Sequence, residues 1–390
     1  MTDGTRRSTD GASSGSRRGR RAFLSRLTAA TGAVGALGAL AGCGGSDTSD
    51  TSDAEEPSTP PDPEEPAIPP DLQGPDGPFD SVPAPFDSIA DLAEFGADPS
   101  AAGSLEAAVT DAAADGRLLF LPSGRYRMEG VLELSGVARF GLVGGEATRV
   151  PSSGTTETDD GSVLLDSLHF DLGGNGVESR AVDARVSDRL ELFDVSVTGT
   201  LDAGRGAVRV DVTDPDGSGV VERLSLRDGA AAETTATGCY VGDENRGSIT
   251  FRDCEIEGFP DNGLYAAPSR GRIVVEGGYY ANNGIANVRV RSGSVVRGVH
   301  VRCDAGDRPL KNMRGIRLSN DAPTADAEPT VVEDVVVEMV DVTGSDGAIT
   351  LSEEVAAAEI RDATVVVHAD DVRALWAKTP HQSIQSAEAA

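Results

Sequence analysis

The sequence has little lysine and little positive charge for its length. Of its 34 basic residues only Lys311 and Lys378 are lysines, and 64 residues are acidic, which gives a formal charge of −30 at pH 7. A surface this acidic repels the phosphate backbone of DNA and RNA. The composition therefore argues against nucleic acid as a partner.

Cysteine and histidine are too few and too scattered to organise the fold. After Cys43 only Cys239, Cys254 and Cys303 remain, which permits one disulfide at most. No Cys/His spacing suits zinc, and the four histidines lie far apart in the chain: His169, His300, His368 and His381. Neither disulfides nor a structural metal are expected to hold the fold together.

Carboxylates, in contrast, are abundant and are spread over the entire folded part. This bias, with arginine in place of lysine, resembles that of proteins from extreme halophiles. In such proteins hydrated carboxylates keep the surface soluble, and salt screens their mutual repulsion. The resemblance implies that the acidity reflects a saline habitat rather than the ligand.

The first 43 residues read as an export signal. Basic residues precede an apolar run over 27–40, which is too short and too glycine-rich to span a membrane. Arg20 and Arg21, followed by Ala-Phe-Leu, resemble a twin-arginine signal, although Gly19 stands where that family usually has Ser or Thr. Such signals export folded proteins.

Residues 40–43, Leu-Ala-Gly-Cys, resemble a lipobox. The resemblance implies that Cys43 becomes the lipidated first residue of a protein held at the extracellular face of the cell membrane, although a plain signal peptide with an incidental cysteine is the alternative. Residues 44–84 are rich in Ser, Thr, Pro and acid, with no Lys or Arg, so a disordered, extended tether is expected. The folded domain is expected over 85–390.

A repeat organises this domain. A glycine precedes a short strand-like run at intervals of 21 to 32 residues, at Gly206-Ala207, Gly238-Cys239, Gly263-Leu264, Gly284-Ile285, Gly315-Ile316 and Gly347-Ala348. A polar turn and a second run follow each time, as in SITFRDCEIEG and TVVEDVVVEMV. Two strand runs per unit predict a solenoid, whereas helical repeats and β-propeller blades do not fit this period.

The interior of such a solenoid is a continuous column of Val, Ile, Leu and Ala, which needs few aromatic residues and agrees with the aromatic content of 4%. Asn262-Gly263 and Asn283-Gly284 are interpreted as corners of successive coils. Asparagine tolerates left-handed backbone and can bond the equivalent group one rung away, and glycine relieves crowding as the chain enters the next strand.

The stretch from Phe86 to Thr148 carries a family resemblance. Phe-Gly-Ala-Asp is followed by an Ala-rich amphipathic helix over 104–114, a strand over 117–121 and Pro-Ser-Gly-Arg-Tyr. This order resembles the start of proteins of the pectate-lyase-like superfamily. The resemblance implies an all-β fold, a single-stranded right-handed parallel β-helix whose N-terminal α-helix caps the hydrophobic column.

Members of that superfamily include polysaccharide lyases, polygalacturonases, esterases, epimerases and tailspikes, so the fold does not decide the activity. The polygalacturonase motifs Asn-Thr-Asp, Gly-His-Gly and Arg-Ile-Lys are absent, and so is the pectate-lyase signature Arg-x-Pro-x-x-Arg. No catalytic residue is therefore carried over from the resemblance.

Strand alternation predicts a binding face instead. Apolar residues such as Val208, Leu264 and Ile316 point inward, so their neighbours point outward. If the rungs stack in register, the outward stripe consists of Arg209, Tyr240, Tyr265, Asn287, Arg289, Arg291 and Arg317. The turn residues that flank it are Asp243, Glu244, Asp261, Asn262, Asn282, Asn283, Asn312 and Arg314. If Ile285 opens its strand instead of Val288, Asn287 and Arg289 turn inward.

Several roles follow for this stripe. Tyr240 and Tyr265 are expected to stack on sugar rings, and the arginines to bind carboxylates or sulfates in bidentate fashion. The residues expected to bind substrate are Arg209, Tyr240, Tyr265, Asn287, Arg291 and Arg314, and the catalytic candidates are Asp243, Asp261, Arg289 and Arg317. The alternative is that the arginines form ordinary surface ion pairs with nearby Asp and Glu.

Two kinds of catalysis fit these candidates. A lyase would use an arginine of the stripe as base, with Asp243, Asp261 or Glu244 holding a bridging Ca²⁺, although no motif supports a metal and no cofactor is predicted. A hydrolase would need two carboxylates roughly 5–9.5 Å apart, and Asp243 with Asp261 is the pair to test. Two other residues are placed elsewhere: His300 on another face, and Trp376 in a C-terminal plug.

The sequence therefore supports a surface-anchored protein that binds an acidic polysaccharide and, as an enzyme, would be a lyase, hydrolase or epimerase. A non-catalytic structural or adhesive module of the cell envelope is the alternative. The partners expected are the polysaccharide and, through Cys43, the membrane.

Overall fold

The structure is a computed structural model. It describes residues 86–128, 132–134, 137–145, 149–151, 156–158, 161–172, 180–202, 204–304, 312–321, 328–378 and 383–386. The predictions for the export signal, for Cys43 and for the tether lie outside these residues.

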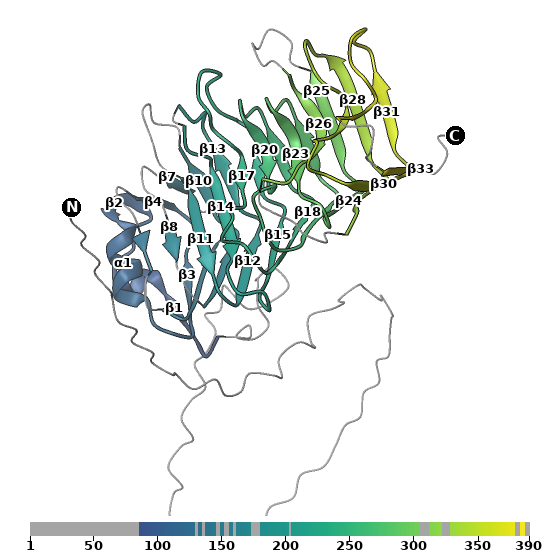
Figure 1. The fold of residues 1–390 in the computed structure, drawn as a ribbon. Helices are drawn as coiled ribbons and strands as arrows, with labels where there is room; N and C mark the ends of the chain where they lie inside the picture. Colours follow the sequence, from purple (N-terminus) through teal and green to yellow (C-terminus); the bar gives the residue numbers. More distant parts are fainter. Residues whose placement is uncertain are drawn as a thin grey trace, which may run out of the picture. The chain divides into compact units, whose positions relative to one another are not determined.

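The described residues form three parallel sheets that wind around one axis (Figure 1), as the right-handed parallel β-helix prediction requires. Sheet 1 contains β1 (Ser88–Asp91), β3 (Arg117–Leu121), β6 (Arg139–Gly144), β9 (Ser162–Asp166), β12 (Arg189–Phe193), β15 (Ser218–Glu222), β18 (Ser248–Arg252), β21 (Ile273–Glu276), β24 (Val295–Arg297), β27 (Thr330–Glu333), β30 (Ala357–Arg361) and β33 (Ser383–Ser386).

Sheet 2 contains β2 (Ser100–Ser104), β4 (Arg125–Arg127), β7 (Arg149–Pro151), β10 (His169–Asp171), β13 (Ser196–Thr198), β16 (Ser225–Leu226), β19 (Glu255–Glu257), β22 (Tyr279–Ala281), β25 (His300–Asp304), β28 (Val336–Asp341) and β31 (Thr364–Val367). Sheet 3 contains β5 (Leu132–Glu133), β8 (Thr156–Thr158), β11 (Val182–Val186), β14 (Val208–Val212), β17 (Cys239–Tyr240), β20 (Asn262–Tyr265), β23 (Ala286–Val290), β26 (Arg314–Leu318), β29 (Ile349–Leu351) and β32 (Leu375–Ala377).

Each coil therefore has three strands, and the prediction of two strand runs per unit was wrong. The second run bends between sheets 1 and 2 at a residue with left-handed backbone, which a side-chain–bearing residue rarely adopts. This bend recurs at Ser167, Asp194, Arg223, Asp253, Gly277, Gly298, Asp334 and Asp362, all with φ between 47° and 67°. In all but one of these coils an apolar residue such as Val195 or Cys254 follows and packs inward. In the sequence the two short strands therefore read as one run.

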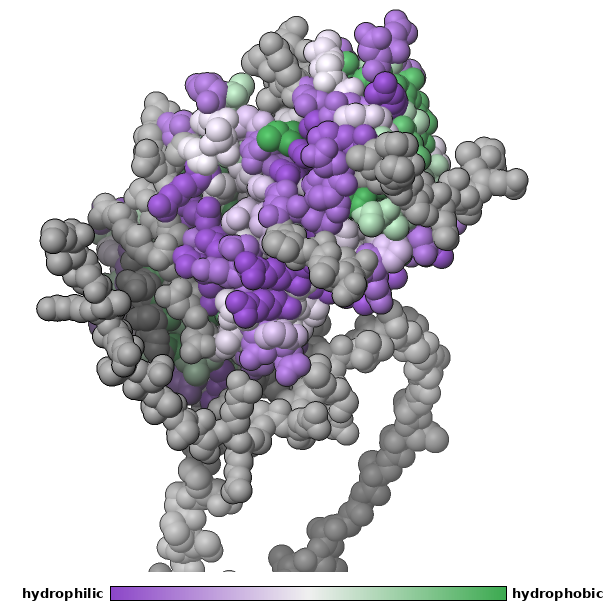
Figure 2. Space-filling model, in the orientation of Figure 1, coloured by the Kyte–Doolittle hydropathy of each residue, from purple (hydrophilic) through white to green (hydrophobic). Residues whose placement is uncertain are grey.

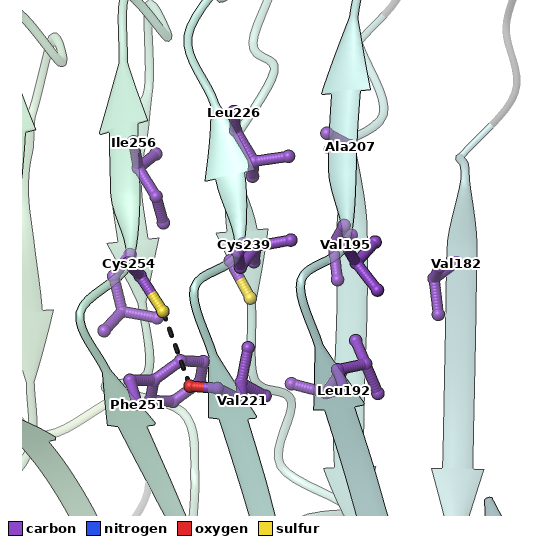
Figure 3. Close-up of a cluster of buried hydrophobic side chains, with 14 of the residues drawn as sticks. Val182, Leu192, Val195, Ala207, Val221, Leu226, Cys239, Phe251, Cys254 and Ile256 are labelled. Atoms are coloured by element: carbon purple, nitrogen blue, oxygen red, sulfur yellow. Dashed lines mark hydrogen bonds between the residues drawn. The ribbon is translucent and has the colours of Figure 1, made fainter. Parts of the chain in front are cut away.

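The interior is the predicted aliphatic column. Figure 3 shows successive rungs of it, where Leu192, Val221 and Phe251 stack in one row, with Val195 in the coil of Leu192 and Cys254 and Ile256 in the coil of Phe251. All three described cysteines are buried and free of disulfides. Burial raises the pKa of the Cys254 and Cys303 thiols to about 12, so these thiols behave as apolar packing groups.

The two Asn-Gly pairs are not equivalent corners, which corrects the sequence interpretation. Asn262-Gly263 lies in β20, where Asn262 pairs with Ala286, whereas Asn283-Gly284 lies in the turn before β23. A Cβ on Gly263 would come within 2.5 Å of the Asn283 amide nitrogen. Glycine at this position therefore makes room for the asparagine of the next coil.

The N-terminal end is capped as predicted. Helix α1 (Leu105–Ala112) begins after Ser104 and buries one face, with Leu105 and Val109 joining the column, and the short 3₁₀ helix η2 (Leu92–Phe95) packs beside it. Figure 1 places α1 beside β2 and β4 at this end. Neither helix, nor any other in the described ranges, is long and apolar enough to cross a membrane.

The C-terminal end has no such helix among the described residues. Its last strands in sheets 2 and 3 are β31 and β32, and Leu375 of β32, which pairs with the buried Ile349, is 38% exposed. In Figure 2 most of the described surface is hydrophilic, and apolar atoms gather where Figure 1 shows β28 and β31. Trp376 is not a plug over this end, because its side chain lies on the outer face of sheet 3.

Candidate functional site

The outer face of sheet 3 carries the predicted stripe as a continuous ladder of paired residues. From coil to coil the ladder runs through Asp183, Arg209, Tyr240, Tyr265, Arg289, Arg317, Thr350 and Trp376. At roughly 4.8 Å per rung these eight positions span about 34 Å. We call this set the sheet-3 ladder.

Two tyrosines occupy the middle of the ladder. The Tyr240 and Tyr265 rings meet edge to face, with their centroids 5.4 Å apart. Arg209 lies 5.5 Å from the Tyr240 ring, and the Arg289 guanidinium lies 4.4 Å from the Tyr265 ring. Cations stacked on both sides of an aromatic pair fix the orientation of the rings, so their remaining open surface is preorganised for a ligand.

Most arginines of this face are neutralised within the chain. The Arg289 guanidinium bonds both oxygens of Asp321, at 2.8 and 2.9 Å, and Asp321 also accepts from the Tyr265 hydroxyl at 2.5 Å. Arg209 is paired with Asp211 and Glu244, and Arg314 with Asp346. For these arginines the alternative interpretation is confirmed as far as the ion pairs go, but the pairs are not ordinary surface pairs, because the arginine side chains are largely buried.

Arg317 is the exception on the ladder. Its Nε atom donates to the Ser352 hydroxyl at 3.3 Å, and it forms no ion pair among the described residues. Burial, followed by the charges of Arg289 and Arg314, lowers the pKa of Arg317. Arg291, just beyond β23, also lacks a carboxylate in the described part of the chain, and its Nε is buried without a partner.

Asn287 does not belong to the outer face, which corrects the prediction that it binds substrate. Its side chain is fully buried and points into the column, where Nδ2 donates to the Cys303 sulfur at 3.0 Å and to the Arg314 carbonyl at 3.1 Å. Alternation begins only at Val288, after the corner, so Arg289 faces outward while Asn287 faces inward. Neither of the two predicted registers holds for the whole strand.

The other asparagines predicted to flank the ladder have structural partners or lie in turns. Asn283 is buried and bonds the Phe259 amide and the Ile256 carbonyl, and Asn282 has left-handed backbone and bonds Glu257 and the Asp304 amide. Asn262 is buried beside Asp261, and Asn312 also has left-handed backbone.

The predicted carboxylate pair is not brought together. Asp243 follows β17 and lies near Arg270 at 3.6 Å, whereas Asp261 precedes β20 and accepts from the Thr237 hydroxyl at 2.7 Å. The two aspartates therefore lie at opposite ends of neighbouring strands. Glu244 pairs with Arg209, so the three acids do not form one Ca²⁺ ligand set, and no cluster of three metal-ligating side chains occurs within the described ranges.

His300 lies in sheet 2, as predicted, away from the ladder. It is half-exposed and its Nε2 lies 2.8 Å from Glu338, while its ring packs against Tyr279. These contacts give it a structural partner on that face.

Two features of this face were missed in the sequence. An open depression of about 390 Å³ is lined by Arg185, Thr213, Glu244 and Arg246, next to the buried Asp211. A second, smaller cavity lies between Arg317 and Trp376. Inward–outward alternation also predicts an outward Trp376 when it is applied to the last strand of sheet 3. Leu375 pairs with the inward Ile349, so its neighbour Trp376 points outward.

Asp211 is expected to make stability depend on pH. It is 0% exposed, and burial raises its pKa to about 6, although Arg209 opposes this. Between the unfolded pKa near 3.8 and this value, the folded chain holds a proton that the unfolded chain has released. Stability therefore falls as pH rises through this window, by roughly 1 kcal/mol per pH unit, and does not change further above it.

The test is to measure the midpoint of urea unfolding at several pH values between 4 and 7, for the wild type and for Asp211→Asn. The asparagine keeps an acceptor for the Gly242 amide. The variant should lack this component of the pH dependence. Glu244→Gln, which alters the half-exposed partner of the same arginine, should retain it. An Asp211→Asn profile that parallels the wild type would show that the carboxylate is ionised throughout.

Comparison with known proteins finds similarity only among solved structures. No protein-family model matches the chain, and no curated protein sequence matches it. The Agl-KA catalytic domain is 10% identical over 78% of this chain and 69% of its own, with a TM-score of 0.38. The A-module of the mannuronan C-5 epimerase AlgE4 of Azotobacter vinelandii is 12% identical over 78% and 100%, with a TM-score of 0.36.

A third similar structure is PfbA, a surface adhesin of Streptococcus pneumoniae, which is 10% identical over 71% of this chain and 91% of its own, with a TM-score of 0.32. At these identities and scores no activity is transferred from any of the three to this chain. The fold rests on the strand pairing described above, and the function has to be argued from the sheet-3 ladder.

Proposed function

We propose that this protein binds a polysaccharide along the sheet-3 ladder. The observation that carries the proposal is that the half-exposed rings of Tyr240, Tyr265 and Trp376 lie in one outward row with Arg317, which has no ion pair among the described residues. A row in which two adjacent aromatic rings are followed by hydrogen-bond donors and then by a third ring suits a linear chain of sugars.

The polymer we propose is acidic. A neutral glycan would leave the Arg317 guanidinium without a counter-charge, whereas a carboxylate or sulfate group would neutralise it. We further propose that the domain is exported and held at the outer membrane surface through Cys43, in a saline habitat. These last points rest on the sequence motifs and the composition.

We propose binding in preference to hydrolysis. Asp243 and Asp261 lie at opposite ends of neighbouring strands, and Asp211 is inaccessible to a ligand in the folded chain. A binding protein needs no such carboxylate pair. The same preparation should be assayed for unsaturated and reducing ends with each polymer, because either product would establish a lyase or a hydrolase instead.

Tyr240→Ala is expected to weaken polysaccharide binding about tenfold, because a ring stacked on the ligand is lost. Binding should be measured in molar salt, where long-range electrostatic attraction is screened and short-range contacts dominate. The panel should include polygalacturonate, alginate, dextran sulfate and neutral dextran.

Tyr279→Ala is the matched control, because Tyr279 is a half-exposed tyrosine of sheet 2. It should leave binding unchanged. Equal losses in the two variants would place the binding face elsewhere.

A second function, a rigid structural module of the cell envelope, is favoured by the ion pairs that neutralise Arg209, Arg289 and Arg314. It requires no accessible cation and no ligand on the ladder. If none of the polymers binds and the wild type is nevertheless stable and monodisperse, this second function accounts better for the molecule.

A further inference from the structure

Two arginines of the sheet-3 ladder, in successive coils, bond a serine in the same way but differ in whether a carboxylate pairs with them. Arg289 and Arg317 are paired in register, and each Nε atom donates to a serine of the following coil, Ser319 at 2.8 Å and Ser352 at 3.3 Å. The terminal nitrogens differ: those of Arg289 meet Asp321, and those of Arg317 meet no carboxylate among the described residues.

The acidic residue two positions after each serine explains why Arg289 has a carboxylate partner and Arg317 does not. Asp321 follows Ser319 at this interval, and Glu354 follows Ser352 at the same interval. The Glu354 carboxylate accepts from the Asn320 amide at 3.3 Å, and its backbone carbonyl accepts from the Asn320 side chain at 3.1 Å. Glu354 is thereby held toward the previous coil, and Arg317 is left without the carboxylate that its neighbour has.

A cavity of about 40 Å³ lies beside Arg317. Its lining includes Arg314, Arg317, Thr350, Ser352, Trp376 and Lys378. Thr350 is 2% exposed, and its hydroxyl is buried without a hydrogen-bond partner in the described structure. A buried hydroxyl without a partner is costly, and a ligand atom in the cavity would remove that cost.

The charge of the cavity is positive in a chain whose formal charge is −30. Three cations line it, and the one acid, Asp346, is bound to Arg314 through two guanidinium nitrogens. The volume holds roughly three water-sized atoms, which is the size of a carboxylate or of the terminal oxygens of a sulfate group and is too small for a sugar ring. A guanidinium fork matches either group in shape and charge.

We propose that this cavity is a subsite for one oxyanion substituent of a sugar, a carboxylate or a sulfate ester. The terminal nitrogens of Arg317 and the Thr350 hydroxyl hold the anion, Lys378 lies at the rim, and the sugar ring that carries the anion lies against Trp376. The inference rests on the proposed function, because it places an anionic sugar of the bound polysaccharide at one end of the sheet-3 ladder.

The only tryptophan of the chain lines this cavity, so its fluorescence reports on the subsite. The full chain should be titrated with oligogalacturonide and with its methyl ester, and with dextran sulfate and dextran, at constant ionic strength. Sodium sulfate serves as the isolated anion, and calorimetry on the same samples measures binding independently. The charged ligand of each pair should bind more tightly, and the fluorescence of Trp376 should change.

Arg317→Ala should weaken binding of the charged ligands about ten- to a hundredfold, which is the loss expected for a hydrogen-bonded charge pair, and should leave the uncharged ones unaffected. Arg317→Lys, which keeps the charge but loses the fork, should recover part of the affinity. The control is Arg272→Ala, because Arg272 is exposed beside sheet 1 and has no ion pair among the described residues.

The outcomes separate this subsite from the proposed function. If polysaccharides bind but the methyl ester binds as well as the acid, and Arg317→Ala has no effect, the subsite is wrong and glycan binding stands. If sulfate binds at Trp376 and no polymer does, the cavity is an anion site and glycan binding fails. If neither sulfate nor any polymer changes the fluorescence or produces heat, both proposals are overturned.

Discussion

Asn287→Ala is expected to lower the free energy of unfolding by about 3–5 kcal/mol without changing the proposed glycan binding of the folded protein. The wild-type amide is fully buried and makes four hydrogen bonds: its oxygen accepts from the Asn283 amide and side chain, at 3.1 and 2.9 Å, and its nitrogen donates to the Cys303 sulfur and the Arg314 carbonyl. Alanine leaves at least two backbone groups buried without partners, each at a cost of about 1–3 kcal/mol.

Urea unfolding of the wild type and the variant measures this loss. Asn282→Gly is the control, because Asn282 is half-buried and has a φ of 55° that suits glycine, so its free energy of unfolding should change by no more than about 1 kcal/mol. Binding is compared under conditions in which both variants are folded. A stable Asn287→Ala protein that has lost glycan affinity would mean that this side chain faces outward.

The fold was predictable because its main signal is local and repeated. Inward residues such as Val208, Leu264 and Ile316 recur in register, and the capping helix begins within one residue of its predicted start. The third strand of each coil was not predictable from apolar patterning. Its boundary is a single left-handed residue such as Asp253, which does not interrupt the apolar pattern on either side.

The sequence predicted which residues line up in the candidate site, but not which of its arginines are paired with carboxylates. Alternation placed Tyr240, Tyr265 and Arg289 correctly, because it depends only on each strand's own sequence. The partner of Arg289 is 32 residues away and lies beyond the next strand, so its identity depends on the turn that follows that strand. Which arginine remains unpaired is therefore a property of the turns, which the repeat does not specify.

Asp321→Ala is expected to destabilise the protein by about 3 kcal/mol, and oxyanions should restore part of the loss. The Arg289 side chain is only 10% exposed, so removal of its carboxylate leaves a nearly buried cation without a counter-charge, and the Tyr265 hydroxyl loses its acceptor. Loss of one partner from a buried pair costs about 3–5 kcal/mol, and the 28% exposure of Asp321 places this case at the lower end.

In this variant Arg289 has the same surroundings as Arg317. Its Nε atom donates to a serine hydroxyl, and no carboxylate binds its terminal nitrogens. Sulfate should therefore stabilise Asp321→Ala by about 1 kcal/mol more than it stabilises the wild type, since a ligand that binds only the folded state adds its binding free energy to stability. Asp304→Ala, which breaks the more exposed pair with Arg302, controls for the general effect of sulfate and should lose less than about 1 kcal/mol. If sulfate stabilises Asp321→Ala and Asp304→Ala equally, the Arg289 guanidinium is solvated in the variant. The Asp321 carboxylate would then not occupy a position on the ladder at which a ligand anion can bind.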